Sequence, residues 1–136
     1  MKLRKSIALF AVCLGSSLFG TGSWAACSQL DGSGSWNVYI TIANTNTWAY
    51  CAFKVAANGA ISTGTRCTYA NATFRTVLAG SSLKVNSTCV ANATVNLSGG
   101  VTTTFNHMTF SRDKLQFSGV GSDNFGVKFT YNGIKL

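Results

Sequence analysis

Apolar and polar side chains alternate in short runs along most of the chain. In the first run, Trp36, Val38, Ile40 and Ile42 alternate with Asn, Tyr and Thr. A two-residue period places successive side chains on opposite faces of a strand, so the run predicts a strand with one buried and one solvated face. The same pattern recurs in the segments 51–56, 61–67, 74–78, 83–97, 101–110, 114–118 and 125–131.

Turn signals separate these runs and indicate how the strands connect. Asn58-Gly59 and Gly99-Gly100 are typical of tight hairpins between neighbouring strands. The phase breaks within 101–110, which predicts a β-bulge. The chain has no proline and no helical periodicity. We therefore predict an all-β antiparallel meander of about eight strands that closes into a small β-barrel, because closure removes exposed sheet edges; a two-sheet sandwich is the alternative.

The first residues have the pattern of a secretory signal peptide. Lys2, Arg4 and Lys5 precede an apolar segment, and Ser23-Trp24-Ala25 resembles a signal-peptidase site. We predict a signal peptide at 1–25 and a single β-barrel domain at 26–136, in a secreted or periplasmic protein without a transmembrane span. A lipid anchor on Cys27 is not expected, because Trp24 occupies the place of the Leu-like residue that lipidation requires.

Four cysteines remain after residue 25, which favours two disulfides in a small exported chain: Cys27, Cys51, Cys67 and Cys89. Zinc binding is not expected, because no pair has C-x-x-C spacing and the chain has one histidine. A hairpin around Asn58-Gly59 with one extra residue in its loop places Cys51 opposite Cys67. This predicts the pairs Cys51–Cys67 and Cys27–Cys89.

The motif Gly34-Ser35-Trp36 at the start of the first strand resembles the G-x-W signature of the calycin superfamily, the lipocalins and avidins. The resemblance implies that Trp36 closes one end of a barrel and stacks on a basic residue near the C-terminus, here Lys128 or Lys135. The other lipocalin motifs and the biotin-site residues of avidins are absent, so the resemblance implies an architecture and no ligand.

The net positive charge of residues 26–136 bears on two classes of partner, anionic cell-surface components and nucleic acid. Residues 26–136 keep eight basic side chains against three Asp and no Glu. This excess either attracts an anionic cell-surface component or only keeps a chain with few charges soluble, and the scattered positions of the basic residues favour the second interpretation. The basic residues are scattered and match no known motif, so nucleic acid is not an expected partner.

Catalytic chemistry has few candidate groups in this chain. His107 is the one histidine, and Asp31, Asp113 and Asp123 all lie in turn-like contexts that favour turn capping. We therefore expect no enzyme, no catalytic residue, no metal and no cofactor. The sequons at Asn71, Asn86, Asn92 and Asn96 would carry glycans in a eukaryotic secreted protein, but the signal peptide is of bacterial type.

Two binding surfaces remain as candidates. Tyr39, Trp48 and Tyr50 fall on the outward phase of their strands and predict an external aromatic patch, our candidate ligand-binding residues. The other candidate is the barrel mouth, lined by inward aromatics such as Phe117, Phe125, Phe129 and Tyr131. We expect an exported, non-enzymatic binding protein for an unknown small ligand or protein. The alternative is a periplasmic or surface protein-interaction module, such as an inhibitor or an adhesin-like component.

Overall fold

A computed structural model describes residues 26–136; the expected signal peptide, 1–25, lies outside them. The described residues form one short 3-10 helix and nine strands. These are η1 (Gln29–Gly32), β1 (Gly34–Ile42), β2 (Trp48–Val55), β3 (Arg66–Tyr69), β4 (Phe74–Thr76), β5 (Ser82–Val85), β6 (Val90–Leu97), β7 (Val101–Phe110), β8 (Gln116–Asp123) and β9 (Lys128–Lys135).

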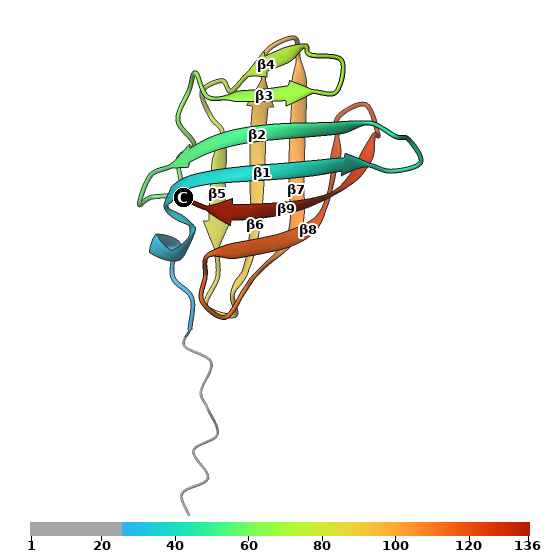
Figure 1. Cartoon of the computed structure of the whole chain (residues 1–136). Helices are drawn as coiled ribbons and strands as arrows, with labels where there is room; N and C mark the ends of the chain where they lie inside the picture. Colours follow the sequence, from blue (N-terminus) through green and yellow to red (C-terminus); the bar gives the residue numbers. More distant parts are fainter. Residues whose placement is uncertain (1–25) are drawn as a thin grey trace, which may run out of the picture.

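All strand pairs of this part of the chain are antiparallel, and they belong to one sheet with the order β4-β3-β2-β1-β9-β8-β7-β6-β5. Figure 1 shows how the sheet curls, with β5, β6 and β7 running behind and across β1, β2 and β9. Because β9 returns to pair with β1, the meander winds back on itself. The meander therefore curls into a partly open barrel with β4 and β5 as its two edges, and it is one sheet and not a two-sheet sandwich.

The two edge segments of the sheet, β5 and the residues just beyond β4, both lie beside β6. We call this junction the seam. Just beyond β4, Val77 bridges Leu97 at the end of β6, whereas Ser82 in β5 pairs with Thr94 further along β6. Both segments therefore run antiparallel to β6 and resemble one strand interrupted by a turn at Gly80, where φ is +82°. Val77 also donates its backbone N–H to the carbonyl oxygen of Thr65 at 2.8 Å. Thr65 directly precedes β3, so this hydrogen bond links the seam to the start of β3.

The end of the barrel beside η1 is closed by packed side chains. Trp36 is 2% exposed, and its ring centroid lies 4.7 Å from Phe117 and 5.8 Å from Phe110. Its indole Nε1 donates to Gly32 O of η1 at 2.9 Å. This hydrogen bond satisfies the polar edge of a buried Trp and holds η1 across the barrel end. The expected role of Trp36 as buried core is confirmed.

Both expected disulfides are present in the described residues. Cys51 and Cys67 are directly opposed partners of β2 and β3 and face the interior, and Cys27–Cys89 links the chain before η1 to the β5–β6 turn. The connection between β2 and β3, however, is not the simple hairpin around Asn58-Gly59 from which we derived the Cys51–Cys67 pair. Val55 bridges Ile61, and the segment 62–65 then shifts the register by two residues before Cys51 meets Cys67. A two-residue shift keeps each side chain on its original face.

Several expected runs are divided or shifted. The run 83–97 splits into β5 and β6, because Asn86 Oδ1 accepts the backbone N–H groups of Thr88 and Val90 and so forms a turn. Only the end of the run 61–67 enters β3. The bulge expected in 101–110 is confirmed: the register of β7 against β8 shifts between Asn106 and Thr109, and His107 has φ +47°.

In the run 74–78 the apolar phase that we expected is inverted. Val77 is 1% exposed and belongs to the core, whereas Phe74 is 55% exposed and Leu78 is 45% exposed. Both faces of this run carry apolar side chains, so the pattern alone does not fix the phase. The disulfide fixes it, because Arg75 pairs with the inward-facing Cys67 and Phe74 must then point outward.

Within the described residues, the helix is too short and too polar to cross a membrane.

Candidate functional site

The end of the barrel opposite η1 is its mouth, and four turns surround it. They are the β1–β2 (43–47), β3–β4 (70–73), β6–β7 (98–100) and β8–β9 (124–127) turns. In an antiparallel meander every second connection lies at the same end. The side chains at these strand ends therefore surround one opening. We treat this mouth as the candidate site.

A cavity of about 50 Å³ lies below the mouth, between the ends of the strands. It has room for a few water molecules and is smaller than the pocket of a drug-sized ligand. Its walls are mostly apolar. The residues that line its upper part are Ile42, Ala49, Tyr69, Leu97, Val101, Thr103, Asp123, Val127 and Phe129.

Two open grooves at the surface border this cavity. One, of about 360 Å³, lies between Thr47, Tyr69 and Arg75, and it shares Tyr69 with the cavity. The other, of about 470 Å³, runs along the β1–β2 and β8–β9 turns and shares Ile42 and Val127 with the cavity. Thr47 borders both grooves. The cavity and the grooves are thus neighbours around the β1–β2 turn, and we consider them together.

Arg75 supplies a fixed cation at the rim. Its Nη1 donates to Ser98 O at 2.7 Å, and a Cβ atom on Gly99 would collide with this nitrogen. Glycine at this position therefore lets the guanidinium approach the β6–β7 turn closely. No carboxylate of the described residues forms an ion pair with Arg75. A guanidinium has five N–H groups, so Arg75 keeps donors for a ligand.

Tyr69 lies beside Arg75 and faces the cavity. Burial is the main cause that raises the pKa of Tyr69; hydrogen bonding and attraction by Arg75 oppose this, and the Asp123 charge adds to it. The phenol is therefore neutral at physiological pH and can donate or accept a hydrogen bond.

Asp123 completes the rim, and its carboxylate also holds a turn. Its Oδ1 accepts the backbone N–H groups of Phe125 and Val127, both at 2.9 Å. Asp113 and Asp31 have similar roles: Asp113 Oδ1 accepts from Leu115 N at 3.1 Å, and Asp31 Oδ2 accepts from Ser28 N at 2.7 Å. The turn-capping role expected for the three aspartates is confirmed.

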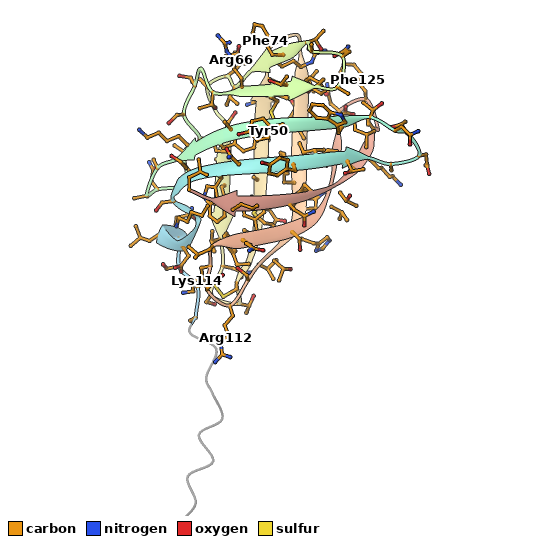
Figure 2. All side chains as sticks on the ribbon, in the orientation of Figure 1. Tyr50, Arg66, Phe74, Arg112, Lys114 and Phe125 are labelled. Carbon is orange, nitrogen blue, oxygen red and sulfur yellow. A yellow bond between two sulfur atoms is a disulfide. The ribbon has the colours of Figure 1, made fainter. Side chains whose placement is uncertain are left out.

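The inward aromatics expected at the mouth lie in different places. Phe117, Phe129 and Tyr131 are buried, and Phe129 lines the cavity. Phe125 does not face the interior: it is 68% exposed, because it sits in the β8–β9 turn that Asp123 caps. Figure 2 shows Phe125 away from the labelled residues of the closed end, Arg112 and Lys114.

The expected outer aromatic patch is assembled on the sheet. Tyr39 and Tyr50 are opposed partners of β1 and β2, with ring centroids 5.2 Å apart, and Trp48 is 50% exposed on the same face. Tyr50 Oη donates to Asn37 Oδ1 at 2.6 Å. Figure 2 shows Tyr50 on β2 and Phe74 with Arg66 further up the same side. Whether these three aromatics bind a ligand stays a prediction.

Sequence reasoning missed the polar groups of the mouth, Tyr69 and Arg75. One signal could have found them: with Cys51 opposite Cys67, the alternation places Tyr69 inward, and the β3–β4 hairpin then places Arg75 opposite Cys67. Their approach to Asp123 and Ser98 depends on closure of the barrel, which no local pattern reveals.

No protein family model and no curated protein matches the sequence. Solved structures of small designed β-barrels do match the fold. A redesigned barrel, mFAP1, bound to DFHBI, has a TM-score of 0.63 and 15% identity, over 79% of this chain and 100% of the other. EF1p2_mFAP2b, also bound to DFHBI, has a TM-score of 0.64 and 10% identity, over 83% of this chain and 98% of the other. A fluorescence-activating β-barrel designed de novo has a TM-score of 0.60 and 9% identity, over 76% of this chain and 93% of the other. At these identities the likeness shows the fold alone.

Proposed function

We propose that this protein is an exported, non-enzymatic binding protein that holds a small ligand in the mouth of its barrel. One observation carries the proposal: Trp36 and η1 cover one end of the barrel, where only a small cavity of about 20 Å³ remains, whereas the apolar cavity of about 50 Å³ lies toward the other end, near a fixed cation, Arg75. An apolar cavity with a few convergent polar groups is the usual form of a small-molecule site. Two disulfides support an oxidising compartment, the periplasm or the exterior.

The shape of the site suggests the shape of the ligand. The cavity of about 50 Å³ accepts only part of a molecule, so the rest must lie in one of the two grooves. A flat ring is the shape that requires the least space in this small cavity while its polar end stays at the rim. The designed barrels mFAP1 and EF1p2_mFAP2b, which share this fold, were solved with the small molecule DFHBI. That likeness makes a small-molecule role reasonable for this chain.

The chemistry of the rim suggests the polar end of the ligand. Arg75 has no carboxylate partner among the described residues and retains N–H donors, while the Tyr69 phenol lies next to it. A carboxylate, sulfonate or phenolate would accept charge-assisted hydrogen bonds there. We propose a flat apolar ligand with one anionic or strongly accepting group.

Absence of catalysis is part of the proposal. His107 is exposed in the β7 bulge, and the three aspartates cap η1 and two turns. A hydrolytic site would need a histidine beside a carboxylate and a nucleophile, and the aspartates already have structural roles.

Anilinonaphthalene sulfonate, a flat fluorescent anion, tests the proposal by titration. We expect saturable binding that Ala49→Leu abolishes, because the added carbons fill the cavity. Ala52→Leu is the matched control: it makes the same change in the same strand on the exposed outer face, and it should bind as the wild type does. Thermal melts confirm that each variant is folded.

A second pair of variants tests the charge. Arg75→Gln should weaken binding by about tenfold or more, the usual worth of a hydrogen bond between charged groups. Lys84→Gln removes the same charge at an exposed position of β5 and should have little effect. If Ala49→Leu binds the dye as well as Ala52→Leu does, the dye is not in the mouth and the proposal is wrong.

A second candidate function is recognition of a macromolecule by the outer face, as a protein-interaction or surface module. The observation that favours it is the exposure of Tyr39 and Trp48 on strands whose outer face no other described element covers. Exposed aromatic patches mark contact surfaces more often than isolated exposed rings do.

A further inference from the structure

The outer face of β1–β4 carries a row of aromatic rings across the strands. Tyr39 pairs with Tyr50, Tyr50 with Thr68, and Thr68 with Phe74, so these four side chains follow one line from β1 to β4. Neighbouring strands lie about 4.8 Å apart, which makes the row roughly 14 Å long. Trp48 stands two residues from Tyr50 on the same face. A row of this length suits an extended polymer better than a single small molecule.

The polar groups between the rings are amides and hydroxyls. Asn132 pairs with Tyr39 and extends the row onto β9, while Thr41 stands opposite Trp48. Tyr50 Oη is already fixed by Asn37, which orients its ring. Aromatic faces pack against the C–H faces of sugar rings, and side-chain amides and hydroxyls form hydrogen bonds with sugar hydroxyls. The face thus offers both contacts that a polysaccharide needs.

The charge of the face selects among polysaccharides. Its cations are Arg66, which lies 4.6 Å from the Phe74 ring centroid, and Lys54 and Lys128 at its margins. No outward position of β1–β4 or β9 is acidic; of the three aspartates, Asp31 lies in η1, and Asp113 and Asp123 cap turns. An anionic polymer therefore meets cations at the Phe74 end and at the margins of the row, and no carboxylate at the outward positions of these strands.

We propose that this face, defined by Tyr39, Trp48, Tyr50, Phe74 and Arg66, binds an anionic polysaccharide. The site is distinct from the barrel mouth, so either proposal can hold or fail alone. The rings supply stacking and the cations supply attraction to carboxylate or sulfate groups. A protein partner is the competing possibility, and it would give no affinity for a polysaccharide.

Affinity electrophoresis at physiological salt tests the inference with alginate, dextran sulfate and uncharged dextran. We expect either charged polymer to retard the wild type while dextran does not. Trp48→Ala and Tyr39→Ala should each weaken binding by about tenfold, which is within the range seen when one aromatic side chain that stacks on a nucleic-acid base is removed. Phe125→Ala is the matched control, because Phe125 is an exposed aromatic in the β8–β9 turn and does not belong to the outward positions of β1–β4.

Charge variants separate recognition from general attraction. Arg66→Gln should weaken binding severalfold more than Lys84→Gln, which removes the same charge elsewhere. Ala49→Leu, which blocks the mouth, should leave polysaccharide binding intact. The inference is overturned if no charged polymer retards the protein, if dextran binds equally well, or if Phe125→Ala and Lys84→Gln weaken binding as much as Trp48→Ala and Arg66→Gln.

Discussion

The Lys135 ammonium lies 5.4 Å from the ring centroid of Trp36 and donates a hydrogen bond to Asp31 O at 3.2 Å. One side chain of the last strand therefore secures both the tryptophan of the first strand and the helix that covers it. This is the stacking partner that the G-x-W resemblance implied, and Lys135 rather than Lys128 provides it. The contact lies at the closed end of the barrel.

Removal of Trp36 should cost much more stability than removal of Trp48. Trp36→Ala empties a buried site between Phe110 and Phe117, and we expect a loss of roughly 3–5 kcal/mol. Trp48→Ala removes a half-exposed ring and should cost less than about 1 kcal/mol. Urea unfolding of both variants measures the difference. Equal losses would contradict the described orientation of β1 and β2.

The two disulfides should be reduced in a fixed order under native conditions. Cys51 is fully buried and Cys67 nearly so, whereas Cys89 is only partly buried in the β5–β6 turn. Thiol–disulfide exchange requires access to a sulfur atom, so Cys27–Cys89 should open first. Mild reduction followed by alkylation and peptide mass spectrometry shows the order. Earlier alkylation of Cys51 and Cys67 would contradict the burial described for the β2–β3 pair.

The ionised carboxylate of Asp31 should stabilise the folded protein at neutral pH, and this stabilisation should be lost in acid. The Ser28 backbone N–H bound to its carboxylate lowers the pKa of Asp31, and Lys114 at 3.1 Å adds to this against the opposing effect of burial. Since the folded pKa lies below the unfolded one, the stabilisation is present above the unfolded value of 3.8 and is lost as the pH falls through the folded pKa.

Asp31→Asn tests this pH dependence. At neutral pH the variant should lose on the order of 0.5–1 kcal/mol, because an exposed ion pair and a charged cap are each worth little more. As the pH falls through the folded pKa of Asp31, which lies below 3.8, the difference should shrink toward zero, because the wild-type carboxyl becomes protonated. A loss that is as large in acid as at neutral pH would show that the charge is not the cause.

The sequence predicted the parts of this fold that depend on local alternation and on cysteine spacing. The phase of β1, the outward position of Trp48 and the Cys51–Cys67 pair follow from residues close together in the chain. We assigned Phe74 and Val77 to the wrong faces because both faces of that run carry apolar side chains. We placed Phe125 inward because the alternation of apolar and polar residues does not reveal the turn that Asp123 caps.

The candidate site was harder to predict than the fold. Tyr69, Arg75 and Asp123 come from three separate strands, and they share the mouth only because β9 pairs with β1 and the seam joins β4 to β6. No periodic pattern encodes that closure. The outer patch was predictable because Tyr39 and Tyr50 lie on consecutive strands joined by a short turn.

The most direct test of ligand binding at the mouth is a proton–nitrogen NMR titration of the protein of residues 26–136 with anilinonaphthalene sulfonate. We expect the amide signals of Ile42, Ala49, Tyr69 and Val127 to shift in a saturable manner. The indole signals of Trp36 at the closed end and of Trp48 on the outer face should stay in place. Shifts confined to Trp48 and its neighbours, or shifts spread without saturation over the whole barrel, would contradict a ligand site at the mouth.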